Sequence, residues 1–225
     1  MISVIIPVLN EEKVLSSCLQ SLFAQTGDYE VILVDGGSTD NTREIASRFD
    51  LHIEQSAKSG RAIQMNAGAS KACGDWLVFL HADTHLPDFA LEHIESLTSS
   101  LNIQAGCFKH QFSGKHFLLK AISWLHNWRC RRSRVIYGDQ CLFLRRELFA
   151  KLGGFPDTEI LEDVMLSEAI IEISKPIILC DAVITDSRKF ERRGIIRSFA
   201  EIFLIMSCYE LGLPIKGRGF FSPTR

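Results

Sequence analysis

The first 80 residues alternate apolar runs with amphipathic stretches, and this order constrains the fold more than any other feature of the chain. Residues 3–8 and 30–35 are dominated by apolar side chains, as expected of parallel strands buried on both faces. Between them, apolar residues recur at helical spacing over 11–25, and two glutamates fall in the predicted first turn, where the helix dipole favours them. The alternation continues to a strand over 76–80. It predicts an α/β domain with a mainly parallel sheet and helices on both faces.

Past Pro87 the order of elements becomes less regular. Residues 105–112 are typical of a strand in an antiparallel addition, and a strand and a short helix precede a Gly-Gly stop. No repeat and no linker interrupts the chain, so a single domain is predicted over residues 1–225, with a variable second half. The other elements predicted for that half are helices over 87–100, 115–128, 161–174 and 195–211, and strands over 176–180 and 182–187.

The composition is that of an ordinary globular protein, with 46% hydrophobic and 23% charged residues. The net charge of −2 gives no sign of a nucleic-acid partner. The start of the chain lacks the basic segment of a signal peptide, and no run of 18 apolar residues could span a bilayer. The seven cysteines are scattered and never form a C-x-x-C pair. We therefore expect reduced cysteines in a cytoplasmic protein rather than ligands of zinc.

Acidic side chains follow two of the predicted strands where those strands end. Because ligands of parallel sheets bind at the carboxyl ends of the strands, these loops are expected to meet at one edge. Asp35 stands before two glycines. It either accepts hydrogen bonds from a base or a ribose, or belongs to a polar turn that caps the next helix. Asp83, with His81 and Thr84 beside it, either binds a hard divalent cation or is a turn residue before Pro87.

Two adjacent acids, Glu162 and Asp163, stand at the head of the helix predicted over 161–174. Acidic residues in a first helical turn complement the helix dipole. The same position can also direct a general base into a cleft. The pair taken alone leaves both interpretations open.

Four motifs occur in order along the chain: IPVLNEE at 6–12, VILVDGGSTD at 31–40, LHAD at 80–83 and LED at 161–163. In this combination the chain resembles the family 2 glycosyltransferases of GT-A fold. The resemblance extends from Ile2 to about Leu213. Longer segments around LHAD and LED are similar to one branch, the small soluble transferases often labelled as arsenosugar-biosynthesis or radical-SAM/selenodomain-associated glycosyltransferases.

The resemblance implies a metal-dependent, inverting transfer of a sugar from a nucleoside-diphosphate sugar to a hydroxyl acceptor. Residues 1–86 would form the nucleotide-sugar half, and residues 87–225 the acceptor half with its C-terminal helix. Asp83 would bind Mn²⁺ or Mg²⁺, and Asp163 would be the general base. The positions that match donor-binding residues of the family are Pro7, Val8, Asn10, Glu11, Asp35, Gly37, Ser38, Arg61, Asn66, Ala82 and Asp83. Those matched to the acceptor side or the diphosphate are Gln140, Glu162, Arg188 and Arg193.

Two positions depart from the family pattern. Gly36 stands where a second acid usually follows the second strand, and His81 where the metal motif usually begins with an acid. Histidine can ligate Mn²⁺ or pack against backbone, so its role is open. The departures keep a second hypothesis, a non-catalytic nucleotide-sugar-binding protein. A sugar-phosphate nucleotidyltransferase is a third, although it would need a glycine-rich basic loop where this chain has PVLNEEK.

Residues 96–138 contain no Asp or Glu, but they include seven Lys or Arg residues together with Trp124 and Trp128. Such a stretch can contact an anionic membrane, which suggests peripheral contact at the inner face of the membrane through 115–134 or 195–211. It can also bind an anionic acceptor. The remaining interpretation is a solvated face with the tryptophans in the core. The sequence does not predict the oligomeric state.

Overall fold

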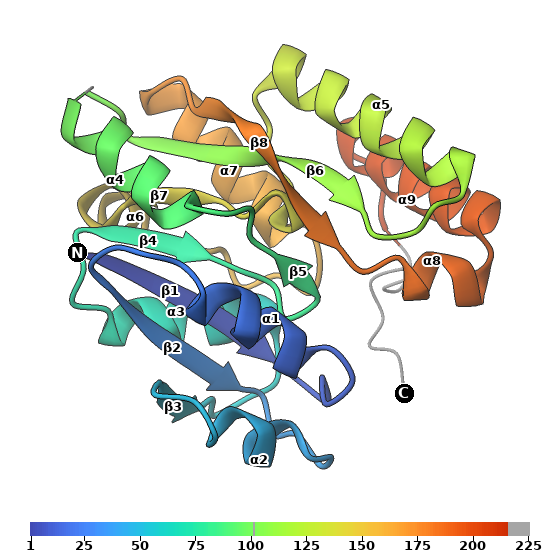
Figure 1. The fold of residues 1–225 in the computed structure, drawn as a ribbon. Coiled ribbons are helices and arrows are strands. Elements are labelled where there is room, and N and C mark those ends of the chain that lie inside the picture. The colour runs from blue at the N-terminus through green and yellow to red at the C-terminus, as the bar shows by residue number, and fades with distance from the viewer. Residues whose placement is uncertain (101, 216–225) are drawn as a thin grey trace.

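The computed structural model describes residues 1–100 and 102–215. Within these ranges eight strands form one sheet in the order β3-β2-β1-β4-β7-β6-β8-β5 (Figure 1). The pairs among the first four strands are parallel, and the later strands add a mixed half. The strands are β1 (Ile2–Val8), β2 (Tyr29–Asp35), β3 (His52–Gln55), β4 (Trp76–Phe79), β5 (Thr84–His85), β6 (Ala105–Phe112), β7 (Phe143–Arg145) and β8 (Ile177–Thr185).

Helices flank this sheet, as the sequence predicts (Figure 1). None of the helices in the described ranges is both long and apolar enough to cross a membrane. The helices are α1 (Leu15–Phe23), α2 (Thr42–Ala46), α3 (Arg61–Lys71), α4 (Ala90–Ser100), α5 (Phe117–Ser133), α6 (Arg146–Leu152), α7 (Glu162–Ile173), α8 (Arg188–Arg193) and α9 (Ile195–Glu210), with a 3-10 turn η1 at Gly138–Gln140.

The side chains of β1 alternate between two cores, and this places helices on both faces of the first half. Val4 and Ile6 belong to the core that includes the buried residues of α1. Ile5 belongs to the other core, together with the buried residues of α3. Gly68 allows α3 to lie close to β1, because a Cβ at that position would be 2.5 Å from Ile5 Cγ2. The carboxyl ends of β1, β2 and β4 therefore share one edge between the two helical layers.

The start of the first helix differs from the sequence prediction. Helix α1 begins at Leu15, so Glu11 and Glu12 precede it instead of occupying its first turn. Their backbone N–H groups donate to side chains of the loop after β2: Glu11 N to Thr42 Oγ1 and Glu12 N to Asp40 Oδ2. These bonds attach the residues before α1 to the loop after β2, and Val14 N and Leu15 N donate to Glu11 O, so a turn precedes the helix.

The second half also contains two differences from prediction. Residues 177–185 form one strand, β8, instead of two strands broken near Asp181. Pairing with β6 continues on both sides of Asp181, with a register shift between Cys107↔Ile178 and Lys109↔Ala182, and the Asp181 carboxylate contacts His93 Nδ1 at 3.2 Å. Helix α8 was not predicted at all. It is a single basic helix that follows β8 directly and brings its charges back toward the strand ends.

Candidate active site

The loops after β1 and β2 are tied to each other by side-chain hydrogen bonds. Asn10 N donates to Ser38 Oγ at 3.0 Å, and Asn10 Oδ1 accepts from Thr39 N at 2.8 Å. Asn10 adopts a positive φ of 59°, a conformation that asparagine tolerates better than most residues. The predicted donor residues Asn10 and Ser38 therefore lie together in one fixed wall at the edge of the sheet.

Asp35 ends β2 beside Val8 of β1 and is 1% exposed. Its Oδ1 accepts from Ser38 N at 3.0 Å and from Ser38 Oγ at 2.5 Å. Its Oδ2 is buried and has no hydrogen bond to the residues that the structure describes, with Arg43 Nε 3.9 Å away. The carboxylate is thus held on one side and leaves an acceptor oxygen on the other. Ser38 binds this carboxylate and does not cap α2.

The glycine at position 36 is explained by Gln64 of α3. Gln64 Nε2 donates to the carbonyl oxygens of Val8 and Val34, both at 2.8 Å. A Cβ at Gly36 would lie 3.0 Å from the Gln64 side chain. Gly36 stands where a second acid is usual, and the buried amide of Gln64 lies beside it and bonds the ends of β1 and β2. Next to it, Gly37 has φ +96°, which favours glycine.

Asp83 lies after β4, where the sequence predicts it. Its Oδ1 accepts one hydrogen bond in the described residues, from Thr84 Oγ1 at 3.3 Å. Burial raises the pKa of Asp83, and the positive charge of Arg61 opposes that rise. Burial and the charge of Asp83 raise the pKa of Glu11 to about 7. Two carboxyl groups from different loops therefore share this site, an arrangement that a cation would stabilise.

His81 is a neutral ring at the same edge. Burial, with the charge of Arg61, lowers its pKa to about 3. The ring lies against Gly138, where a Cβ would be 2.7 Å from His81 Nε2 and 3.2 Å from Asp163 Oδ2. The His81 ring and the Asp163 carboxylate thus face the same glycine. A neutral imidazole keeps a lone pair available, so His81 can serve as a metal ligand.

Asp163 lies at the start of α7, after Leu161 in a left-handed conformation with φ 62°. Its Oδ2 accepts a hydrogen bond from Gly138 N, and its Oδ1 accepts from Val164 N at 2.8 Å. Burial and the neighbouring charge of Glu162 raise the pKa of Asp163 to about 6. Glu162 is 3% exposed and contacts Arg61 Nη1 at 3.4 Å. The structure therefore joins the predicted acid pair to the start of α3.

Basic side chains of α8 add positive charge near the acidic residues of the site. The sequence singled out Arg188 and Arg193, which pair with Asp186 (Arg188 Nε, 2.9 Å) and Glu201 (Arg193 Nη2, 2.9 Å). It overlooked Lys189. Burial lowers the pKa of Lys189 to about 8, and the charges of Asp83 and Glu11 oppose the shift, which places this ammonium in the same field. The sequence could have indicated this position of Lys189 only if residues 188–193 had been recognised as a helix.

Two of the predicted site residues are engaged within the fold. Asn66 Nδ2 donates to Phe155 O at 2.8 Å, and Asn66 Oδ1 accepts from Phe155 N at 2.9 Å. Gln140 is fully buried, accepts from Tyr137 N at 3.2 Å, and donates to Phe108 O at 3.4 Å. These amides join distant segments, so their contacts indicate support of the site rather than direct binding.

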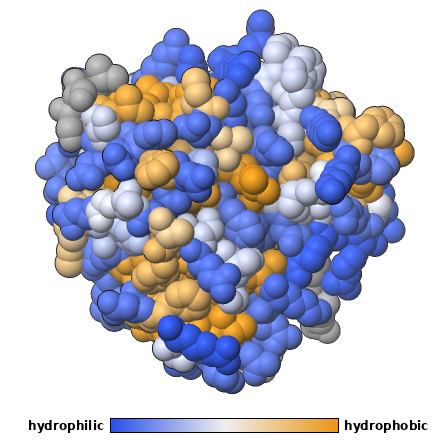
Figure 2. Space-filling view, in the orientation of Figure 1, coloured by the Kyte–Doolittle hydropathy of each residue, from blue (hydrophilic) through white to orange (hydrophobic). Residues whose placement is uncertain are grey.

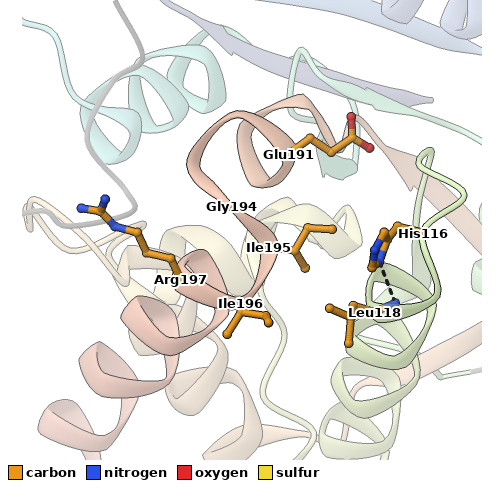
Figure 3. A pocket seen from close by; sticks show the side chains of 7 residues that line it. All are labelled: His116, Leu118, Glu191, Gly194, Ile195, Ile196 and Arg197. Carbon is orange, nitrogen blue, oxygen red and sulfur yellow. Dashed lines mark hydrogen bonds between the residues drawn. The ribbon is translucent and has the colours of Figure 1, made fainter.

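The remaining predicted positions are Pro7, Val8 and Ala82 at the strand ends. Val8 and Ala82 are buried and contribute backbone to the edge. A separate pocket of about 410 Å³ opens between the start of α5 and the turn from α8 to α9 (Figure 3). His116 and Leu118 face Ile195 and Ile196 across it. None of its lining residues is among the predicted donor residues.

The order of the motifs along the chain and the residues at this edge of the sheet agree with a comparison against protein families. The family model for glycosyl transferase family 2 matches residues 3–152 of the 225. The chain therefore belongs to glycosyl transferase family 2.

Curated relatives match only part of the chain. A PGL/p-HBAD biosynthesis glycosyltransferase of Mycobacterium tuberculosis is 47% identical over 93 residues, covering 38% of this chain and 36% of the relative. Glycosyltransferase AglE of Haloferax volcanii is 28% identical over 170 residues, covering 69% of this chain and 56% of AglE. The chain thus spans little more than a third of the length of the mycobacterial relative.

Solved structures match a larger share. Mannosyltransferase PcManGT from Pyrobaculum calidifontis, in complex with GDP-Man and Mn²⁺, has a TM-score of 0.74 at 21% identity, covering 96% of this chain and 65% of that one. Glucosyl-3-phosphoglycerate synthase from Mycobacterium tuberculosis, in complex with Mn²⁺, UDP and phosphoglyceric acid, has a TM-score of 0.66 at 19% identity, covering 96% and 80%. At these identities the likeness concerns the fold, and it confirms the predicted GT-A type.

Proposed function

We propose that this chain is a metal-dependent, inverting glycosyltransferase that moves a sugar from a nucleoside-diphosphate sugar to a hydroxyl acceptor. The observation that carries the proposal is a convergence of charged groups from three distant segments. Asp83 follows β4, Arg61 begins α3 and Asp163 lies in the first turn of α7, and the charge of Arg61 acts on both carboxylates. The named relatives and solved structures, which are glycosyltransferases in their own right, support the same activity.

The wall formed by the loops after β1 and β2 would bind the nucleoside. Asp35 holds Ser38 with one carboxylate oxygen and has the other without a hydrogen bond. That second oxygen can accept from a ring N–H of a base or from ribose hydroxyls. Arg61 and the basic residues Arg188 and Lys189 of α8 would face the diphosphate, whose negative charge offsets their mutual repulsion. The neighbours held UDP and GDP-Man, so both bases are candidates, and we favour uridine.

Asp83 fits a divalent cation such as Mn²⁺ or Mg²⁺. Its carboxylate accepts a hydrogen bond from Thr84 Oγ1, lies near Glu11, and gains stability from any added positive charge. His81 supplies a neutral imidazole in the same region. When bound, the cation would act as a Lewis acid that neutralises charge on the leaving diphosphate.

Asp163 would act as the general base. A hydroxyl is a weak nucleophile until its proton leaves, and a carboxylate whose pKa is about 6 is largely ionised at neutral pH yet more basic than an ordinary aspartate. The acceptor O–H proton would pass to Asp163 while the acceptor oxygen bonds the anomeric carbon. The bond from that carbon to the diphosphate oxygen breaks, and the diphosphate keeps the electron pair. A single displacement of this kind inverts the anomeric centre.

The two alternatives explain less of the geometry. A non-catalytic binder would leave the buried, backbone-held Asp163 without a role. A sugar-phosphate nucleotidyltransferase would need a basic glycine-rich loop after β1, where the structure has the acidic loop with Glu11 beside Asp83.

Titration calorimetry with UDP and with GDP, each with and without Mn²⁺, tests the donor site. We expect one nucleotide to bind, and to bind at least tenfold more tightly with Mn²⁺. Asp83→Asn should abolish the effect of Mn²⁺. Asp88→Asn, an exposed acid five residues later, is the matched control and should retain it. No binding of either nucleotide under any condition would overturn the proposal.

We also propose peripheral contact with an anionic membrane through α5. Phe117, Trp124 and Trp128 are 71%, 68% and 48% exposed and share one stripe of this helix. The basic residues Lys120, Arg131 and Arg132 flank the stripe and are exposed too. Apolar and hydrophilic side chains mix over this side of the surface in Figure 2. This corrects the interpretation that places the tryptophans in the core.

Sedimentation with vesicles tests this contact. We expect binding to vesicles that contain phosphatidylglycerol, weaker binding to phosphatidylcholine alone, and loss of binding in the double variant Trp124→Ala/Trp128→Ala. Concentration-dependent dimers in the absence of binding would contradict it. A cytoplasmic location fits this proposal, since all seven cysteines are free thiols.

A further inference from the structure

A cluster of two histidines and one aspartate lies outside the set of residues proposed to bind the donor. His110 belongs to β6, His126 to α5 and Asp139 to η1. His110 Nε2 lies 3.6 Å from Asp139 Oδ2, and His126 Nε2 lies 3.7 Å from Asp139 Oδ1. One ligand atom from each residue can be chosen so that all three lie within 4.8 Å of one another. Three separate segments thus bring metal-ligating atoms to one point.

The facing atoms of this cluster lack hydrogen bonds to the described part of the chain. His110 Nε2, His126 Nε2 and Asp139 Oδ1 are buried without a hydrogen-bond partner there. The His110 side chain is fully buried and that of His126 is 9% exposed. Burying polar atoms without a partner is costly, and separations of 3.6 and 3.7 Å are too long for direct hydrogen bonds. The arrangement therefore calls for a bridging species.

The spacing is near that of a metal site. Bonds of about 2.0–2.2 Å in tetrahedral or trigonal geometry place ligand atoms roughly 3.3–3.7 Å apart. The separations of 3.6 and 3.7 Å fall in this range but reach different oxygens of Asp139, and one ligand atom from each residue lies within 4.8 Å of the others, so the side chains would draw together around an ion. Two imidazoles and one carboxylate form a donor set preferred by zinc-class transition metals rather than by Mg²⁺.

The surrounding contacts hold the ligands in place. Asn127 Oδ1 accepts from His110 N at 2.8 Å, and Asn127 Nδ2 donates to His110 O at 2.9 Å. This pair of bonds ties β6 to α5 beside both histidines. The His126 ring packs on Tyr137 with centroids 4.9 Å apart. The guanidinium of Arg129 stacks on the same Tyr137 ring and is the main opposing charge that any bound cation would meet.

We propose that His110, His126 and Asp139 form a binding site for a zinc-class transition metal, separate from the cation proposed at Asp83. Three protein ligands leave a fourth position for water or for a ligand from solution. The site would tie β6 and α5 to η1, whose Gly138 N donates to Asp163. Metal occupancy would thereby fix the turn that holds Asp163. Only this last consequence rests on the proposed function.

Zn²⁺ titration of the full chain, after chelator treatment and without nucleotide, tests the site. We expect one Zn²⁺ per chain, a raised thermal midpoint on Zn²⁺ addition, and with Co²⁺ a visible absorption band typical of tetrahedral coordination. His126→Ala and Asp139→Asn should each weaken Zn²⁺ binding at least tenfold.

His93→Ala is the matched control, because His93 also faces a carboxylate, Asp181, at 3.2 Å, but on the surface. It should bind Zn²⁺ as the unaltered chain does. The proposal is overturned by the absence of Zn²⁺ binding, or by equal loss in His93→Ala and His126→Ala. Calorimetry with UDP and GDP tests the donor site independently, so the failure of one proposal does not overturn the other.

Discussion

The two halves of the molecule build their share of the site in different ways. In the first half, polar groups at the strand ends bond to one another across adjacent loops, as Asn10 does with Ser38 and Thr39. In the second half, polar groups from distant elements face each other across gaps that are too long for hydrogen bonds, as His110 and His126 do with Asp139. Among the described residues the first half also contains one buried oxygen without a hydrogen bond, Asp35 Oδ2, whereas in the second half all three facing atoms of the His110, His126 and Asp139 cluster lack one.

In the proposed function this difference corresponds to binding and chemistry. A wall with many hydrogen bonds of its own is suited to recognise a constant part of a substrate, such as a nucleoside. Groups with shifted pKa values are suited to react: the pKa of Asp163 is raised to about 6 in the second half, and that of Glu11 to about 7 in the first, beside Asp83. Each prediction below perturbs one half and asks whether the other responds.

The largest effect is expected from Asp163→Asn. Removing the general base should lower turnover of the nucleotide-sugar by about 10²–10⁴-fold, while nucleotide affinity changes little. Nucleoside diphosphate release measures the first and calorimetry the second. Glu172→Gln, an exposed acid on the same helix, should preserve both. Equal losses in turnover and affinity would show that the halves are not separable.

The pH dependence of turnover tests the proposed role of Asp163 as the general base in a second way. Asp163 must be ionised to accept a proton, and burial with the charge of Glu162 raises its pKa to about 6. kcat/KM should therefore be constant above about pH 7 and fall about tenfold per pH unit below pH 6. A profile of kcat/KM from pH 5 to 8.5 measures this. An acid limb near pH 4 would assign the base to an unperturbed carboxyl.

Asn66→Ala should affect stability more than binding. The loss of two hydrogen bonds to the Phe155 backbone should cost about 1–3 kcal/mol in the free energy of unfolding. Nucleotide affinity should change less than about twofold, because the amide points to Phe155. Urea unfolding and calorimetry measure the two. Asn102→Ala, at an exposed amide, should cost less than about 0.5 kcal/mol. A tenfold loss of nucleotide affinity with an unchanged free energy of unfolding would indicate that Asn66 binds the donor.

The smallest effect is expected from Gly36→Ala. The added Cβ would lie 3.0 Å from Gln64 and should destabilise the fold by about 1 kcal/mol. Gln64→Ala removes that contact, so the double variant should be more stable than the sum of the single changes predicts. Thermal unfolding of all three variants measures the coupling. Strict additivity would show that Gln64 does not explain the glycine.

Sequence reasoning predicted the first half well, because there the periodicity of apolar residues and the polar strand ends are local signals. Asp35 and Asp83 lie at the predicted strand ends, and Arg61 acts on both Asp83 and Asp163, while the roles of these residues stay predictions. Sequence reasoning failed where contacts between residues distant in the sequence determine the local structure. Thr42 and Asp40 bind the residues before α1, pairing with β6 joins β8 on both sides of a register shift near Asp181, and His110, His126 and Asp139 meet only in three dimensions.

The most direct test of the account is a crystal structure of the chain with Mn²⁺ and whichever of UDP and GDP binds. We predict that the nucleoside lies against Asp35 and Ser38, with the metal on Asp83 and the diphosphate between Asp83 and Arg61. The Asp163 carboxylate should then face the open side of the diphosphate. A nucleotide bound in the pocket between α5 and α9, or one that leaves Asp83 without contact, would contradict the claim that both halves meet at a single active site.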